Sequence, residues 1–359
     1  MNKRILISLS VIGAVAALVI GGTIAYFSDT ETSTGNTFTA GTIDISVDNA
    51  NPWNGKFTLA DMKPSYTDYI NFTIQNFGSD PNPVNVWKKI TVTGETTGAQ
   101  SEPECTEQHG CWDNSAKACD WHSTGCVGID KNDISTVILY DLYVTVYDSA
   151  HTKIWWQAIY TEDVTVAEIA SWGHIYLGMI PAGGYMEVKQ SYHMKSDTTN
   201  WAQGDIMPFN IEVKAEQLQG TAWLENKTLP DGGQGPWKIV HGDGIYGTLT
   251  YKVKNPRFDF SFTGKAPLAS HTYYLIAGWK VVGTGYDVDT VLGSGTTDGT
   301  GNITITGNPE LGKDMKNVKV WLVPAENWSG SEVTWGGWPG CVANFLWETG
   351  LIWYDDTGI

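Results

Sequence analysis

The stretch Phe209–Gln217 reads Phe-Asn-Ile-Glu-Val-Lys-Ala-Glu-Gln, in which apolar and polar residues alternate. Side chains of a β-strand point alternately to its two faces, so this pattern predicts a strand with one buried face and one wet face. We predict an all-β chain whose larger part is a jelly-roll-type β-sandwich, because many half-buried strands are typical of two packed sheets. Similar alternation marks residues 43–47, 69–75, 84–92, 137–147, 175–179 and 186–194.

Composition agrees with this fold class. The 359 residues include 40 glycines, and Thr, Tyr, Val, Ile and Trp are frequent, as expected for strands joined by many turns. Helical periodicity is nearly absent. The best candidate helix is Val164–Trp172, where Thr165 is followed three residues later by Glu168, the pattern of a capping box.

The length and the charge distribution both indicate two domains. Residues 26–219 carry 25 acidic and 10 basic side chains, whereas residues 220–359 carry 14 and 10. A second, smaller β-sandwich is expected from strands near 247–253, 257–263, 273–280, 303–307 and 318–322. The predicted organisation is a signal peptide at 1–25, a sandwich at 26–219 with a Cys-rich insertion at 99–130, a linker at 220–236, and a C-terminal β domain at 237–359.

The amino-terminal end has the features of an export signal. Lys3-Arg4 precede the uncharged apolar run Ile5–Ile24, and small residues follow. Signal peptidase is expected to cut between Ala25 and Tyr26. The alternative is an uncleaved membrane anchor, since about 20 apolar residues suffice to cross a bilayer. Either way we expect an extracellular or cell-surface protein.

Three stretches of sequence resemble a known family. The residues Gly21-Gly22-Thr23-Ile24-Ala25-Tyr26-Phe27-Ser28-Asp29, followed by Phe38-Thr39-Ala40-Gly41-Thr42-Ile43-Asp44-Ile45, are similar to the start of the TasA/camelysin family of secreted proteins. Residues 59–92, and 200–205 leading into 209–217, agree with it too. The resemblance covers about residues 1–219. Members of the family build extracellular fibres, and archaeal relatives form bundling pili.

The resemblance implies a jelly roll and a function. The chain would be a structural subunit of an extracellular filament or pilus, of the kind found in biofilm matrices. Copies would join head to tail as the mature N-terminal strand, with Tyr26, Phe27 and Phe38 as its apolar anchors, completes a neighbouring sandwich. The alternative is that this segment pairs within its own subunit.

The second domain leaves another function open, a non-polymerising surface adhesin that binds glycans. Nine of the 17 tryptophans follow residue 219. Aromatic rings stack on sugars, but they also fill β-sandwich cores, and core packing is the favoured interpretation.

An enzymatic function is disfavoured. Camelysin is described as a metallo-endopeptidase, yet the sequence has no His-Glu-x-x-His motif to hold zinc and activate water. We therefore predict no catalytic residues, no metal and no cofactor, with a camelysin-like protease as the less favoured alternative. Nucleic-acid binding is disfavoured as well, because a net charge of −17 repels phosphate backbones.

Four cysteines lie close together in the predicted insertion. Cys105, Cys111, Cys119 and Cys126 favour two disulfides in an exported protein, although the sequence leaves three pairings open. A zinc site is the alternative, but the cysteines lack the close Cys-x₂₋₄-Cys pairs of structural zinc sites. The fifth, Cys341, is either a buried small residue or an intermolecular tether.

Four Asn-x-Ser/Thr sequons make glycosylation plausible. They begin at Asn226, Asn302, Asn327 and Asn71. Asn71 falls within a predicted strand, so it qualifies only if its side chain faces solvent.

Overall fold

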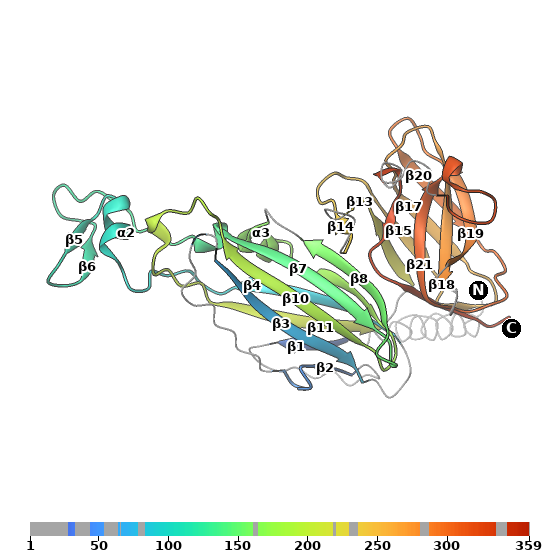
Figure 1. Cartoon of the computed structure of the whole chain (residues 1–359), viewed down its shortest axis with the longest axis horizontal. Helices are drawn as coiled ribbons and strands as arrows, with labels where there is room; N and C mark the ends of the chain where they lie inside the picture. The colour runs from blue at the N-terminus through green and yellow to red at the C-terminus, as the bar shows by residue number, and fades with distance from the viewer. Residues whose placement is uncertain are drawn as a thin grey trace, which may run out of the picture.

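The structure is a computed structural model, and it describes residues 28–32, 44–53, 64, 66–77, 83–160, 164–217, 220–229, 236–280, 287–334 and 343–358. Nearly all of its regular structure is β, as predicted. Two β-sandwiches follow one another along the chain, and a small two-stranded insertion projects from the far end of the first (Figure 1). Each sandwich has its own hydrophobic core.

The first sandwich packs a four-stranded sheet against a seven-stranded sheet. The smaller sheet has the order β1-β11-β4-β9, formed by Ser28–Thr32, Phe209–Gln217, Val84–Val92 and Ile175–Ile180. The larger has the order β13-β14-β8-β7-β10-β3-β2, formed by Lys227–Thr228, Lys238–Ile239, Lys153–Tyr160, Ile138–Tyr147, Tyr185–Met194, Thr67–Asn76 and Ile45–Val47.

The alternating stretch at 209–217 forms β11 with the predicted bounds. Ile211, Val213 and Ala215 are buried in the core between the sheets, while Glu212 and Lys214 are only partly buried. Period-two patterning therefore specifies which face of this strand is covered.

Strand β8 was not predicted, although it lies beside β7 in the larger sheet. Its buried face includes the polar residue Gln157, which accepts a hydrogen bond of 2.5 Å from the Lys227 ammonium. A glutamine at a core position removes the apolar alternation that would have revealed the strand.

The predicted helix forms α3, Val166–Ser171. The Thr165 hydroxyl accepts from the Glu168 amide, and the Glu168 carboxylate accepts from the Thr165 amide at 2.8 Å, so the capping box is present. The other short helices are α2 at Glu102–Glu107 and single 3₁₀ turns at Ile134–Thr136, Asn200–Ala202 and Ala325–Asn327. Helix α2 belongs to the insertion, together with β5 and β6 at Cys111–Asp113 and Ala118–Asp120.

The second sandwich packs two five-stranded sheets. One has the order β20-β17-β15-β12-β22, formed by Asn302–Gly307, Phe260–Lys265, Tyr246–Tyr251, Thr221–Glu225 and Trp347–Glu348. The other has the order β16-β23-β21-β18-β19, formed by Lys254–Asn255, Ile352–Asp356, Met315–Pro324, Thr272–Lys280 and Asp287–Thr296.

The expected linker at 220–236 is partly wrong, because strands occupy most of its described residues. Strand β12 pairs with β15 and β22 in the second sandwich. Strand β13 pairs with β14, which in turn runs parallel to β8 of the first sandwich. The chain between the two cores therefore connects them through backbone pairing, and the glycines and prolines of this stretch punctuate strands.

Aromatic contacts also join the sandwiches. Trp223 of β12 lies 5.5 Å from Trp87 and 4.8 Å from Tyr176, measured between ring centroids, and both partners belong to the smaller sheet of the first sandwich. Leu351 of the second half of the chain is buried in the core of the first sandwich. These apolar contacts place the two sandwiches against one another.

Candidate functional site

The first candidate site is an edge of the smaller sheet. Strand β1 forms this edge, and its residues Ser28 to Thr32 pair antiparallel with Glu216 to Glu212 of β11. On its other side β11 pairs along its whole length with β4. Removing β1 would leave one side of the backbone of residues 212–216 without strand partners, and such an edge can pair with another chain.

The expected donor segment overlaps this strand. Its anchors Tyr26, Phe27 and Phe38 lie outside the described residues. The part that is described, β1, pairs within its own chain, which is the alternative arrangement considered from the sequence.

The energy of docking β1 is small. Five paired residues make roughly five ladder hydrogen bonds, each worth about 1 kcal/mol net. Ordering five residues costs about 1–2 kcal/mol each. The strand sequence Ser-Asp-Thr-Glu-Thr contains no apolar residue to add hydrophobic burial. The two contributions cancel to within a few kcal/mol, so little net energy holds β1 against β11.

The expected export signal, with its expected cleavage point between Ala25 and Tyr26, lies outside the described residues. Within the described ranges, no helix is long and apolar enough to cross a membrane.

The four clustered cysteines form two disulfides. Cys105 of α2 joins Cys119 of β6, and Cys111 of β5 joins Cys126, with Cα–Cα distances of 5.5 and 5.3 Å. The bridges interleave along the chain, so together they tie the helix, the hairpin and the following loop into one unit. Cys341 lies outside the described residues.

Carboxylates gather where this insertion meets the first sandwich. Burial, together with the negative charges of Glu104, Asp130, Asp133 and Glu95, raises the pKa of Asp205 to about 7. Burial also raises the pKa of Glu104, which is 1% exposed. This junction is therefore destabilised by like charges at neutral pH.

Histidines do not form a metal site in the part of the chain that the structure describes. There, no three His, Cys, Asp or Glu residues are arranged to hold a metal ion. His174 contacts Glu212 at 2.9 Å, His193 lies 3.7 Å from Asp141, and the His241 ring contacts the Ile159 carbonyl at 2.6 Å. The remaining four are His109, His122, His151 and His271.

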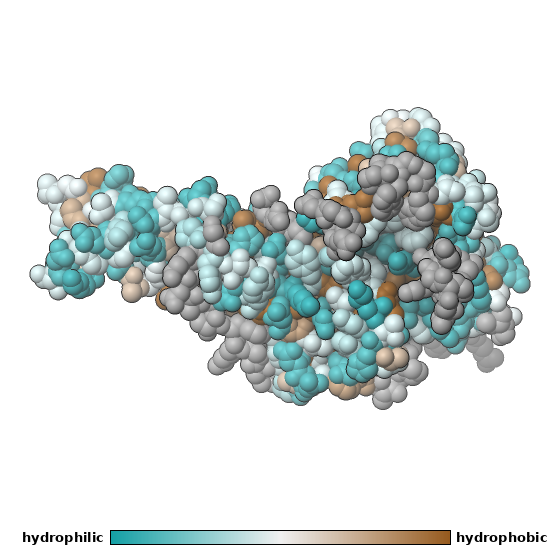
Figure 2. Space-filling view, viewed as in Figure 1, coloured by the Kyte–Doolittle hydropathy of each residue, from teal (hydrophilic) through white to brown (hydrophobic). Residues whose placement is uncertain are grey.

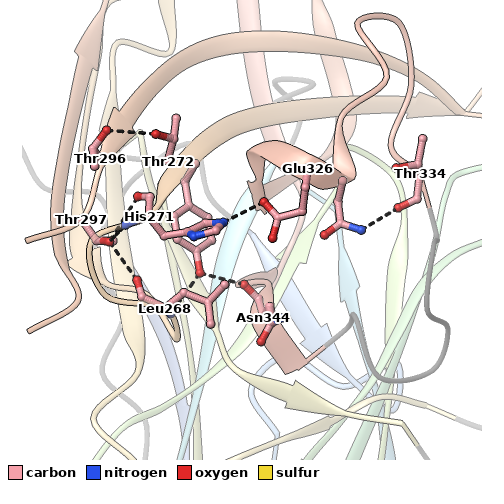
Figure 3. Close-up of polar contacts among 10 residues, drawn as sticks. Leu268, His271, Thr272, Thr296, Thr297, Glu326, Thr334 and Asn344 are labelled. Atoms are coloured by element: carbon pink, nitrogen blue, oxygen red, sulfur yellow. Dashed lines mark hydrogen bonds and ion pairs between the residues drawn. The ribbon is translucent and has the colours of Figure 1, made fainter. Parts of the chain in front are cut away.

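His271 has the neighbours of a catalytic relay but not its geometry (Figure 3). Its Nε2 atom lies 2.7 Å from the Glu326 carboxylate. Thr297, the nearby hydroxyl, accepts from the backbone amide of His271 and donates to the carbonyls of Leu268 and His271. Because backbone groups engage this hydroxyl, the ring does not activate it as a nucleophile.

The four sequons differ in exposure. The side chains of Asn71 and Asn302 are exposed and that of Asn226 is half-buried. Asn327 is 6% exposed, and its amide donates to the Thr334 carbonyl at 3.1 Å. Asn327 is therefore not positioned to carry a glycan in this fold, whereas Asn71 meets the condition set for it.

A cavity of about 620 Å³ opens between the two sandwiches. The first sandwich supplies the start of β8, Lys227 of β13 and Trp237, which directly precedes β14, and the second sandwich supplies residues of β21 and β22. Five of the ten lining residues are tryptophans and three are lysines; the lining residues are Lys153, Ile154, Trp155, Trp156, Lys227, Trp237, Lys319, Trp321, Trp347 and Glu348.

Lys227 lies at the buried side of this cavity. Its ammonium donates to Gln157 Oε1 and to the carbonyl of Glu348. Burial lowers the pKa of Lys227 to about 8, with the charge of Lys319 acting in the same direction and that of Glu348 opposing it. The ammonium therefore stays mostly protonated at pH 7.

The sequence places nine of the 17 tryptophans after residue 219, and the structure shows that the cavity takes tryptophans from both sandwiches. Trp155 and Trp156 come from β8, the strand that the sequence did not reveal. The apolar pair Trp155-Trp156 beside Lys153 was the available signal.

Comparison with known proteins gives one family match. A family model described as camelysin metallo-endopeptidase matches residues 2–222, which include the expected export signal and the first sandwich apart from its short strands β13 and β14. No curated protein matches the chain significantly.

Proposed function

Because the chain belongs to the camelysin metallo-endopeptidase family, which includes secreted fibre-forming proteins, we propose that it is a structural subunit of an extracellular filament. In this proposal the mature N-terminal strand of one subunit takes the place of β1 in the next. The observation that supports it most directly is the marginal, edge-located pairing of β1 with β11.

Strand exchange conserves the contacts already present in the monomer. A neighbour's β1 would make the same ladder with residues 212–216 of β11, so exchange costs no pairing energy. Residues 33–44 separate β1 from β2 and reach at most about 40 Å when extended. That length permits β1 to leave its own sheet and dock on another subunit while the sandwich stays folded.

Surface composition also favours main-chain pairing over hydrophobic association. On the face seen in Figure 2, hydrophilic residues predominate and hydrophobic residues appear as scattered patches. Net charge adds to this argument, because a chain at −17 repels its own copies at long range. Directed hydrogen bonds at an open edge can overcome that repulsion locally.

The family description implies a catalytic metal, and the described residues do not fit one. Zincins need two imidazoles and a third ligand around one point. His174, His241 and His271 instead contact single carboxylates or carbonyls, and no group of three metal ligands is present among the described residues. We therefore propose a structural role without a proteolytic step. Casein zymography with and without chelator checks this, and chelator-sensitive cleavage would contradict it.

Export and modification follow from the same proposal. Cleavage at Ala25 would free the donor strand only outside the cytoplasm, so assembly would begin after export. Exposed Asn71 and Asn302 are the sequons best placed to carry glycans on the finished filament.

Deletion of residues 26–37 from the mature protein tests the proposal. The monomer is expected to stay folded by circular dichroism, because β1 contributes little net energy, while filaments disappear from negative-stain micrographs. Adding a synthetic peptide of residues 26–37 should stabilise the truncated monomer, and a scrambled peptide of the same composition is the matched control.

Two results would count against strand exchange. Undiminished filaments from the truncated protein would show that another surface joins the subunits. A truncated protein that fails to fold would show that the segment is an integral strand of its own subunit.

A further inference from the structure

The cavity between the sandwiches combines two kinds of side chain that rarely meet in a core. Its tryptophans offer flat apolar surfaces, and its lysines offer positive charge. The volume of about 620 Å³ lies within the range of roughly 300–1,000 Å³ that is typical of small-molecule sites. It is open to solvent on the side of β8, where Trp156 is 41% exposed.

The rings are held in place by their neighbours. Trp237 and Trp347 lie 4.6 Å apart between centroids, and the Trp321 indole donates to Glu348 Oε2 at 2.6 Å. Across the cavity, the Lys153 ammonium lies 4.2 Å from the centre of the Trp156 ring. A ligand therefore meets preorganised rings, which lowers the entropy cost of binding.

The charge of the cavity is opposite to that of the protein. The chain carries 39 acidic side chains against 22 basic ones, yet three lysines and a single carboxylate line this space. Lys153 and Lys319 make no ion pair with any described carboxylate, and the one lining carboxylate, Glu348, is engaged by Trp321. Two described acceptors use two of the three donors of the Lys227 ammonium, which leaves one for a ligand.

We propose that this cavity binds a carboxylate-bearing saccharide, with the indole rings stacked on sugar faces and the lysines paired with the sugar carboxylates. The hydrogen-rich face of a pyranose ring is apolar enough to cover an indole, while its rim supplies hydroxyls and, in a sugar acid, one negative charge per ring. A dense polyanion such as a nucleic acid fits less well, because the net charge of −17 of the chain repels its closely spaced phosphates.

The site needs both sandwiches, because each of them supplies part of its lining. Lys153 and Trp156 come from the first sandwich, and Lys319 and Trp321 from the second. A bound saccharide therefore bridges the two sandwiches and should hold them against one another. The site is also distinct from the β1 edge, which belongs to the other sheet of the first sandwich.

Binding of trigalacturonate to the full mature chain tests the proposal. Tryptophan fluorescence and calorimetry are the two readouts, and the fully methyl-esterified trisaccharide is the ligand control because it keeps the rings and removes the charge. The acid form is expected to bind at least about tenfold more tightly than the ester, and to weaken as salt is raised.

Two variants locate the site, each with a matched control. Trp156→Ala removes an exposed ring, and Lys319→Gln removes one charge; each should weaken binding about tenfold. Trp172→Ala, which changes an equally exposed ring outside the cavity, and Lys189→Gln, on the outer face of β10, should leave affinity within about twofold.

Three outcomes would overturn the proposal. Equal binding of acid and ester would show that the lysines do not pair with sugar carboxylates. If a protein with a native circular dichroism spectrum binds neither ligand, the cavity is not a saccharide site. Unchanged affinity in both Trp156→Ala and Lys319→Gln would place any binding outside the cavity.

Discussion

A disulfide between β1 and β11 should stop filament assembly while stabilising the monomer. Thr30 and Lys214 are directly opposite each other in the antiparallel ladder, so the double substitution Thr30→Cys and Lys214→Cys places two thiols at a cross-strand position. Replacing Cys341 by Ser in the same chain removes the odd thiol. Once oxidised, β1 is unable to leave its own sheet for a neighbour.

The expected magnitude follows from the loop that the new bond closes. A loop of about 185 residues corresponds to about 5 kcal/mol of lost chain entropy in the unfolded state at 25 °C. Docking of β1 without the bond is neutral to within a few kcal/mol. The oxidised monomer should therefore unfold at a clearly higher temperature than the reduced one, and the difference should approach but not exceed that entropy limit.

The assay compares oxidised and gently reduced protein by sedimentation and negative-stain microscopy. Cys105 and Cys126 are buried, so mild reductant should open the new bond before the native ones, and mass spectrometry verifies this. The control pair is Lys89→Cys with Glu212→Cys, which links β4 to β11 in the same sheet at a paired position that strand exchange leaves unchanged.

The reasoning fails if the oxidised Thr30–Lys214 variant assembles as well as its reduced form. It also fails if the control disulfide between β4 and β11 blocks assembly equally, because assembly would then require opening of the sheet rather than exchange of its edge strand.

Three further predictions concern stability. Lys88 is fully buried, its ammonium contacts the Tyr140 hydroxyl at 2.5 Å, and burial holds its pKa well below the usual value. Lys88→Met should raise the free energy of unfolding by about 1–3 kcal/mol at pH 7, as measured by urea titration. This gain should shrink toward pH 10, where the buried amine no longer needs to lose a proton on folding. The raised pKa of Asp205 means that folding stability falls as the pH rises from about 4 to about 7. Asp205→Asn should therefore change the free energy of unfolding little at pH 4 and raise it by about 1–2 kcal/mol at pH 8 after solvent screening. An equal gain at both pH values would contradict this. Replacing both Cys111 and Cys126 by Ala should cost the insertion about 2–4 kcal/mol and expose it to limited proteolysis while the sandwich cores keep their near-ultraviolet spectrum.

Sequence patterns predicted those elements whose structure depends only on residues close together in the sequence. Strand β11 and strand β4 have the predicted bounds because apolar alternation and burial coincide there. The capping box at Thr165 was recognisable because both of its hydrogen bonds are local in sequence. Such features need no knowledge of distant residues.

The rest depended on contacts between distant residues. Gln157 occupies a core position only because Lys227, far along the chain, satisfies its amide oxygen. Asn327 is buried and its amide donates to the carbonyl of Thr334, a contact that a three-residue sequon does not reveal. The cysteine pairing likewise followed from the placement of α2 beside the β5–β6 hairpin, and spacing alone had left three choices.

The two proposed sites lie on different sheets, and this arrangement allows them to act together. The exchangeable strand β1 belongs to the four-stranded sheet, whereas β8, which carries Lys153 and Trp156, belongs to the seven-stranded sheet on the other side of the core. Exchange of β1 therefore leaves the residues of the cavity unchanged. A filament would present one cavity per subunit along its length, and many weak saccharide contacts on one fibre would act as a multivalent surface. On this argument an acidic polysaccharide should bind assembled filaments far more tightly than the disulfide-locked monomer, although each single site is the same.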